Sequence, residues 1–183
     1  MSNVDYKVFR NETREWLENI CPKSMTGKVN DVAELYWGGI NAEFISDDQK
    51  HWFEAMYNKG WIAPNWEKRY GGGELDTQQH KILIEEMNKL KCKPPLFSFG
   101  ISMLGPALLK FATQEQKDKY LNQITKGEIK WAQGYSEPNA GSDLAGLQCK
   151  AEDKGDYFLV NGSKIWTSYG DKGDWIFCLV KTD

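Results

Sequence analysis

The sequence has no apolar run that approaches the roughly 20 residues needed to cross a bilayer, so we expect no membrane span. Residues 1–6 lack the basic start and apolar stretch of a secretory signal. The four cysteines are scattered without a CxxC pair, which argues against a disulfide scaffold and against a closely spaced zinc site. These absences predict reduced thiols, no bound metal and a cytoplasmic protein.

The sequence also has fewer positively charged than negatively charged residues. Lys and Arg number 23 against 26 Asp and Glu, giving a net charge of −3, so we expect no nucleic-acid partner. Aromatic residues, by contrast, are plentiful: 8 Trp, 8 Tyr and 8 Phe are too many for a solvated, disordered chain. A length of 183 residues is enough for one ordinary domain or two small ones.

The first half of the chain has the period of helices. Residues 5–20 carry an apolar stripe at helical spacing. Residues able to cap a helix start predict three further helices, beginning at Ser46, at Asp76 or Thr77, and at Thr113.

One further segment, from Leu96 to Phe111, is apolar nearly all round, so we expect it to be buried. The Gly105-Pro106 pair should kink or split it, because proline lacks the amide hydrogen that a continuous helix needs.

After Gly127 the pattern changes to the alternation of strands, with turn signals at residues 154–156 and 161–162. The segment from Trp175 to Val180 is apolar on both faces, and a strand of that kind needs cover on both sides. About five short strands are too few to close a β domain. We therefore expect an α+β fold, with a helical domain over residues 1–127 and an incomplete, antiparallel β domain over residues 128–183.

The chemistry is concentrated in two segments, the first of which runs from Gln133 to Gly146. A strand end followed by a loop rich in Gly, Asn and Ser can direct several amides at a phosphate, with Ser136 and Ser142 as further donors. A plain solvent loop is the alternative, and composition alone favours it. Glu137 and Asp143 form a conceivable acid/base pair, but their spacing does not fix their separation.

The second segment runs from Asn161 to Ser168 and should continue as a strand, with Trp166 and Ser168 on the same face. An indole beside a hydroxyl can flank a planar heterocycle, the ring stacking and the hydroxyl reaching a heteroatom. Taken by itself, the segment is better explained as sheet with a packed tryptophan.

Together the two segments resemble the acyl-CoA dehydrogenase family. The run from Tyr135 to Asp143, followed at this distance by the run from Asn161 to Ser168, is similar to the family's paired motifs, except that Asn139 stands where many members have Gly. The resemblance extends over essentially the whole chain. It implies the N-terminal helical domain and about half of the central β domain of a protein that ends in a four-helix bundle.

The resemblance implies FAD as cofactor and α,β-dehydrogenation of an acyl-CoA thioester to a trans-2-enoyl-CoA, with electrons passed to an electron-transfer flavoprotein. It implies that four consecutive residues line the flavin ring: Gln133, Gly134, Tyr135 and Ser136. Ser142 would meet the FAD pyrophosphate side and the acyl-CoA. The other flavin contacts would be Trp166, Thr167 and Ser168, with the Ser168 hydroxyl near flavin N5. No catalytic base can be assigned, because the family's glutamate usually comes from the C-terminal domain.

The motif forms look more like those of bacterial members that act on branched, dicarboxylic or steroid-side-chain thioesters. The resemblance implies a homo- or hetero-oligomer, either a dimer or a tetramer. Two alternatives to a catalytic dehydrogenase stay open: a non-catalytic partner subunit, and a related oxidase that passes electrons to oxygen. The 183-residue chain by itself is expected to be inactive.

Overall fold

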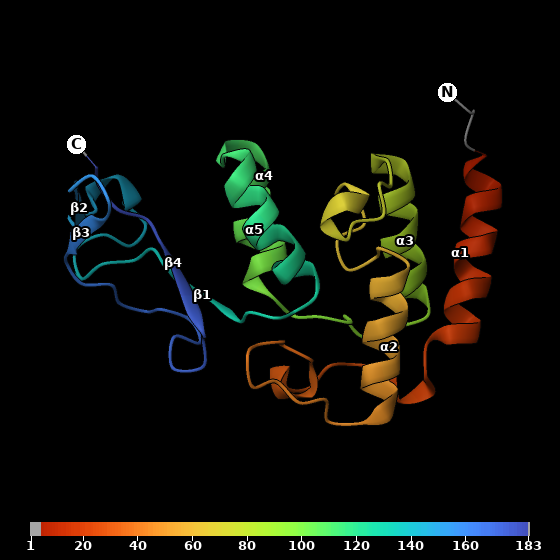
Figure 1. Ribbon diagram of the computed structural model, residues 1–183. Helices are drawn as coiled ribbons and strands as arrows, with labels where there is room; N and C mark the ends of the chain where they lie inside the picture. Colours follow the sequence, from red (N-terminus) through yellow and green to blue (C-terminus); the bar gives the residue numbers. More distant parts are fainter. Residues whose placement is uncertain (1–4, 183) are drawn as a thin grey trace. The chain divides into compact units, whose positions relative to one another are not determined.

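The computed structural model describes residues 5–182, which form two compact units that divide between Glu128 and Ile129. The first unit is helical and the second contains the strands (Figure 1). This composition confirms the α+β class expected from the change of period after Gly127.

The helical unit contains five α-helices within its described residues. Their bounds are α1 Tyr6–Ile20, α2 Asp47–Asn58, α3 Thr77–Lys89, α4 Gly105–Phe111 and α5 Gln114–Thr125. Short 3₁₀ turns occur at Lys23–Met25, Val32–Glu34 and Lys68–Tyr70. All the helices predicted from apolar spacing and capping residues are present.

Side chains cap the helix starts as the sequence predicts. Asp76, rather than Thr77, caps α3, and Asp76 and Thr113 each complete a reciprocal capping box. At α2 the box is only half formed: Ser46 Oγ accepts the Gln49 amide, but Gln49 Oε1 accepts the amide of Ile45 instead. Gly127 ends α5 with a φ of +65°, a conformation that glycine adopts without steric cost.

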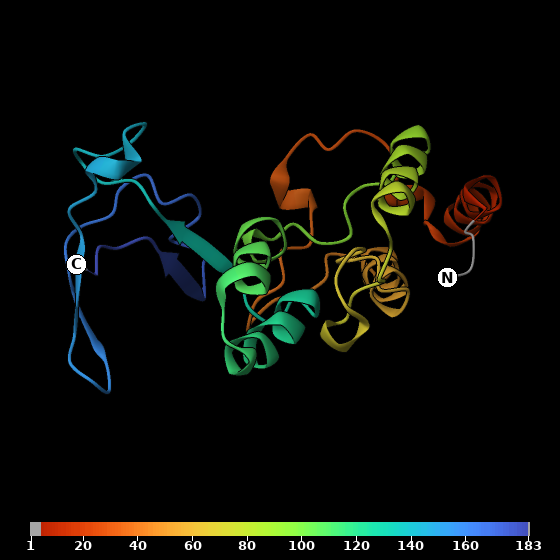
Figure 2. The same cartoon turned by 90° about the horizontal axis from the view of Figure 1, so that it is seen from above.

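The core of this unit lies where α1, α2 and α3 meet. Leu17 from α1, Trp52 and Met56 from α2 and Leu83 from α3 are almost fully buried. In both views α1 lies beside α3 (Figures 1 and 2). The buried carboxylate of Glu86 on α3 joins the two helices, as described below.

The expectation that the segment from Leu96 to Phe111 is buried is wrong. Only Gly100 and Gly105 are fully buried within it, and Phe111 is 77% exposed. The segment divides as predicted, into a π-helical turn at Gly100–Leu104 and the short helix α4, because Pro106 provides no amide. Its apolar side chains border a cavity instead of filling a core.

The second unit contains four strands within residues 129–182: β1 Trp131–Gly134, β2 Lys150–Asp153, β3 Phe158–Asn161 and β4 Trp175–Cys178. β2 and β3 form an antiparallel hairpin around a turn that contains the predicted signal at residues 154–156 and closes with a hydrogen bond from the Lys154 amide to the Tyr157 carbonyl oxygen. β1 and β4 pair in parallel, with Trp131 opposite Trp175, which the sequence analysis does not anticipate. The connection between them spans 40 residues, long enough for such a crossover (residues 135–174).

The strand β4 is incompletely covered within this unit. Trp175 and Ile176 are 44% and 48% exposed, although the sequence of β4 is apolar on both faces. The hairpin strand β3 is exposed along its whole length.

Candidate functional site

The two chemistry-bearing segments, residues 133–146 and 161–168, lie side by side in the β unit. The backbone amide of Ile165 donates a 2.9 Å hydrogen bond to the carbonyl oxygen of Ser136. The residues that follow β1 are therefore bound directly to those that precede Trp166. This is the juxtaposition that a shared site requires, although each segment by itself is ambiguous.

The first segment is fixed by strand pairing. Gln133 and Gly134 belong to β1 and lie opposite Phe177 and Cys178 of β4. Gly134 is buried so tightly that an added Cβ would lie 2.8 Å from Cys178 Sγ. Tyr135 leaves the strand with its ring edge-on to Phe177, at 5.8 Å between centroids. The close packing of β1 on β4 determines where Ser136 lies.

The loop after Ser136 is a tight turn. Glu137 and Ala140 exchange both backbone hydrogen bonds, which leaves Pro138 and Asn139 at the corner. Asn139 keeps a φ outside the left-handed region, so this position does not need the glycine that many members of the resembled family have. Ser142 is exposed in the bend that follows.

The second segment differs from the sequence expectation. Residues 162–167 form no strand, so the prediction that Trp166 and Ser168 share a strand face is wrong. Trp166 has a φ of +54°, unusual for a bulky residue, and its side chain is 84% exposed. Thr167 and Ser168 then enter a turn in which Gly170 donates its amide to Thr167. The alternative of a tryptophan packed in a sheet is thereby excluded, and the indole is presented on the surface.

An ion pair that the sequence analysis missed lies beneath these segments. Lys164 Nζ lies 2.7 Å from Glu137 Oε1, and the side chains are 9% and 6% exposed. Lys164 and backbone amides stabilise the carboxylate, lowering the pKa of Glu137 to about 2. Glu137 is therefore an ionised, fully engaged carboxylate, which removes the acid/base pairing with Asp143 considered from the sequence. The flanking Ser163 and Ile165 gave no signal that Lys164 is enclosed.

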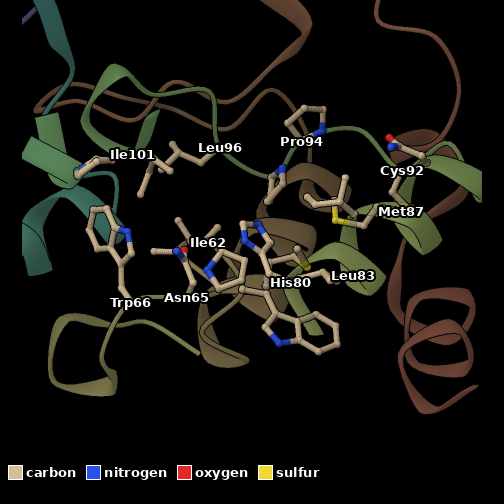
Figure 3. Close-up of a pocket in the computed structure, with 18 of the residues that line it drawn as sticks. Ile62, Asn65, Trp66, His80, Leu83, Met87, Cys92, Pro94, Leu96 and Ile101 are labelled. Atoms are coloured by element: carbon tan, nitrogen blue, oxygen red, sulfur yellow. The ribbon is translucent and has the colours of Figure 1, made fainter. Parts of the chain in front are cut away.

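The helical unit contains a separate, largely apolar cavity of about 750 Å³ (Figure 3). Trp66 and Ile101 lie at one end of the close-up and Met87 and Cys92 at the other, with His80 between them. Gly105 allows the indole of Trp66 to approach, since a Cβ there would lie 2.1 Å from Trp66 Cη2. Periodicity alone does not reveal this cavity, because its lining comes from several elements and the loops between them.

Residues 5–182 contain neither a candidate metal site nor a candidate membrane span. No group of three or more His, Cys, Asp or Glu side chains in this part of the chain could hold a metal ion. No helix among the same residues is long and apolar enough to cross a membrane.

Two comparisons with known proteins, one with a family model and one with a curated relative, point to the same family. Residues 5–128 match the family "Acyl-CoA dehydrogenase, N-terminal domain". The chain is 32% identical over 179 residues to acyl-CoA dehydrogenase IpdE1 of Mycobacterium tuberculosis, covering 98% of this chain and 45% of that protein.

Two solved structures are similar over the full length of the chain. One is the Tcur3481-Tcur3483 steroid ACAD, at 30% identity and a TM-score of 0.65, and the chain covers 44% of it. The other is the ChsE4-ChsE5 complex from Mycobacterium tuberculosis, at 27% identity and a TM-score of 0.66, again with 44% covered. The chain thus spans a little under half the length of these three relatives.

Proposed function

This chain belongs to the acyl-CoA dehydrogenase family. We propose that its residues 133–136 and 166–168 form one side of the flavin site, the flavin wall, in an enzyme that dehydrogenates acyl-CoA thioesters. The hydrogen bond from Ile165 to Ser136 carries the proposal, because it brings the two motif segments together.

The residues present fit a flavin. An exposed indole at Trp166 offers a face for a planar ring, and the adjacent Thr167 and Ser168 offer hydroxyl donors. The segment from Gln133 to Ser136 forms the other part of the flavin wall, because the hydrogen bond from Ile165 to Ser136 joins it to the residues before Trp166. Ser142 is proposed to meet the pyrophosphate side of FAD and the acyl-CoA, from its exposed position after the turn.

When bound, FAD would supply the redox chemistry and accept the hydride from the β carbon of the thioester. The chain's own residues hold and orient the reacting groups. Ser168 is proposed to donate a hydrogen bond where negative charge develops, as oxyanion donors do. Electrons would then pass to an electron-transfer flavoprotein. The described residues include no candidate for the base that removes the α proton.

We further propose that the acyl group is bulky. The apolar cavity of the helical unit, at about 750 Å³, is large enough for more than a short chain. A similar structure at 30% identity is the Tcur3481-Tcur3483 steroid ACAD, and steroid-side-chain thioesters are among the substrates considered from the motif forms.

A non-catalytic partner subunit is a second candidate. Both similar structures are named for two components, Tcur3481 with Tcur3483 and ChsE4 with ChsE5, so a heteromeric assembly is a specific alternative. In that case the chain would contribute flavin contacts or scaffolding while another subunit supplies the base.

The test is to express the protein from its complete reading frame and to identify its chromophore after denaturation. We expect FAD, released in full, because neither motif contains a cysteine or histidine for a covalent link. Colour retained on the denatured chain would refute the non-covalent site. A colourless protein that takes up no FAD would refute the proposal as a whole.

A further inference from the structure

The ion pair between Glu137 and Lys164 is buried in the β unit. Its two side chains are less than a tenth exposed, whereas those of a second ion pair in this unit, Glu152 with Lys154, are 44% and 41% exposed. Burying two charges is costly unless each is paired and fully hydrogen-bonded. The geometry around each partner meets that condition.

The ammonium group of Lys164 donates hydrogen bonds to oxygen atoms on three segments of the chain. It donates to the carbonyl of Tyr135 at 3.1 Å, to Glu137 Oε1 at 2.7 Å and to the carbonyl of Leu179 at 2.6 Å. A single side chain therefore joins the end of β1, the turn that follows it and the residues after β4.

The carboxylate of Glu137 extends the network to a fourth segment. Its two oxygens accept the backbone amides of Gln148 and Cys149, just before β2. Glu137 directly follows Ser136, and Lys164 directly precedes Ile165, whose amide binds Ser136. The ion pair thus flanks the backbone hydrogen bond from Ile165 to Ser136, which joins the two motif segments.

We propose that Glu137 and Lys164 are positioning residues for the bound flavin, holding the segments from Gln133 to Ser136 and from Trp166 to Ser168 in register with each other. This rests on the proposed function. Neither side chain is assigned a contact with the flavin. Their effect runs through the backbone, because a small displacement of a positioned group is enough to slow a reaction greatly.

The test compares Glu137→Gln with Glu152→Gln in the protein from the complete reading frame. Both changes remove one carboxylate that is paired with a lysine in the same unit, but Glu152 is exposed and lies in the hairpin. The readouts are the FAD dissociation constant of the apoprotein, the flavin reduction potential and the rate of flavin reduction by thioester at saturating FAD.

We expect Glu137→Gln to shift the potential and to slow reduction by about 10- to 100-fold in the FAD-saturated protein. Glu152→Gln should have the same flavin reduction potential and reduction rate as the unmodified protein. In the Ser168→Ala background the effect of Glu137→Gln should shrink, because the hydroxyl that it positions is then absent. Equal effects in both backgrounds would overturn the positioning role.

A purely structural role would look different. Glu137→Gln would then lower stability and FAD content, but the FAD-saturated fraction would keep its potential and rate, and that result would refute the inference. If Glu137→Gln does not fold, the double variant Glu137→Gln/Lys164→Met removes both charges and avoids an unpaired buried ion. It should fold and show the same slow reduction. An unmodified protein without FAD would instead refute the proposed function.

Discussion

Arg14 of α1 donates from Nε to Oε2 of Glu86 on α3 at 2.7 Å, and this carboxylate is completely buried. Arg10 and Lys89 bind the other oxygen of Glu86. The helical unit therefore depends on one anion held by three cations. This arrangement stabilises the helical unit and is independent of the proposed flavin wall, so it offers a separate test of the structure.

The Glu86 network predicts acid sensitivity. Hydrogen bonds from Arg14, Lys89 and Arg10 lower the pKa of Glu86 to about 2 from an ordinary value of 4.5. A lowered pKa in the folded state contributes stability above pH 4.5, and this contribution is lost as the pH falls from about 4.5 to about 2. Glu86→Gln should lower stability at neutral pH by about 3 kcal/mol and flatten this acid decline.

Chemical denaturation across that pH range measures the effect. The control is Glu74→Gln, which removes an exposed carboxylate paired with Lys68. It should leave stability nearly unchanged at neutral pH. An undiminished acid decline in Glu86→Gln would contradict the assignment.

Gly134 should not accept a side chain. A Cβ there would lie 2.8 Å from Cys178 Sγ and 2.9 Å from Ile176 Cδ1, so these two side chains of β4 would have to move. Gly134→Ala is expected to destabilise the β unit by about 1–3 kcal/mol. Gly141→Ala is the matched control, because its Cβ would meet nothing within 4 Å. Thermal unfolding of the two variants at equal midpoints would show that the packing is looser than described.

Trp166 should matter for flavin affinity and not for folding. Its indole is 84% exposed, so Trp166→Ala removes little packing. If the ring stacks on the flavin, the FAD dissociation constant should rise about tenfold, by analogy with aromatic stacking on nucleobases. Tyr157→Ala removes another exposed aromatic ring, 62% exposed on the hairpin, and should have no such effect. Equal affinity in both variants would remove Trp166 from the site.

Ser168→Ala should slow flavin reduction more than it weakens FAD binding. A single donor to a reacting centre contributes roughly 3 kcal/mol to the transition state, or about 100-fold in rate. The other flavin contacts would remain, so FAD retention should change little. Stopped-flow reduction at an unchanged rate would exclude Ser168 from this role.

The sequence was sufficient for the helices, because capping residues and apolar spacing are local properties. Asp76 and Thr113, for example, bind amides three residues away. The sequence-based prediction of secondary structure was wrong where contacts between distant parts of the chain decide the conformation. Trp166 alternates like a strand residue but has a left-handed φ of +54°. The two residues before it bind the carbonyl oxygens of Tyr135 and Ser136, just after β1.

The candidate site was predictable only in part, for the same reason. The two motifs could be identified, but neither the Lys164 network nor the cavity follows from spacing. In the sequence Lys164 looks like an ordinary solvated lysine. The fold brings its ammonium group to Tyr135, Glu137 and Leu179, which are not its neighbours in the sequence. The burial of the segment from Leu96 to Phe111 was overestimated, because apolar composition does not distinguish a core helix from the wall of a cavity.

The most direct test of the central claim is an anaerobic titration with acyl-CoA thioesters. The protein from the complete reading frame is loaded with FAD, and its visible absorption is followed as straight, branched and steroid-side-chain thioesters are added. We predict that at least one bulky thioester bleaches the flavin in step with formation of the trans-2-enoyl-CoA. An FAD-loaded protein that no thioester reduces, by itself or with its partner subunit, would contradict the account.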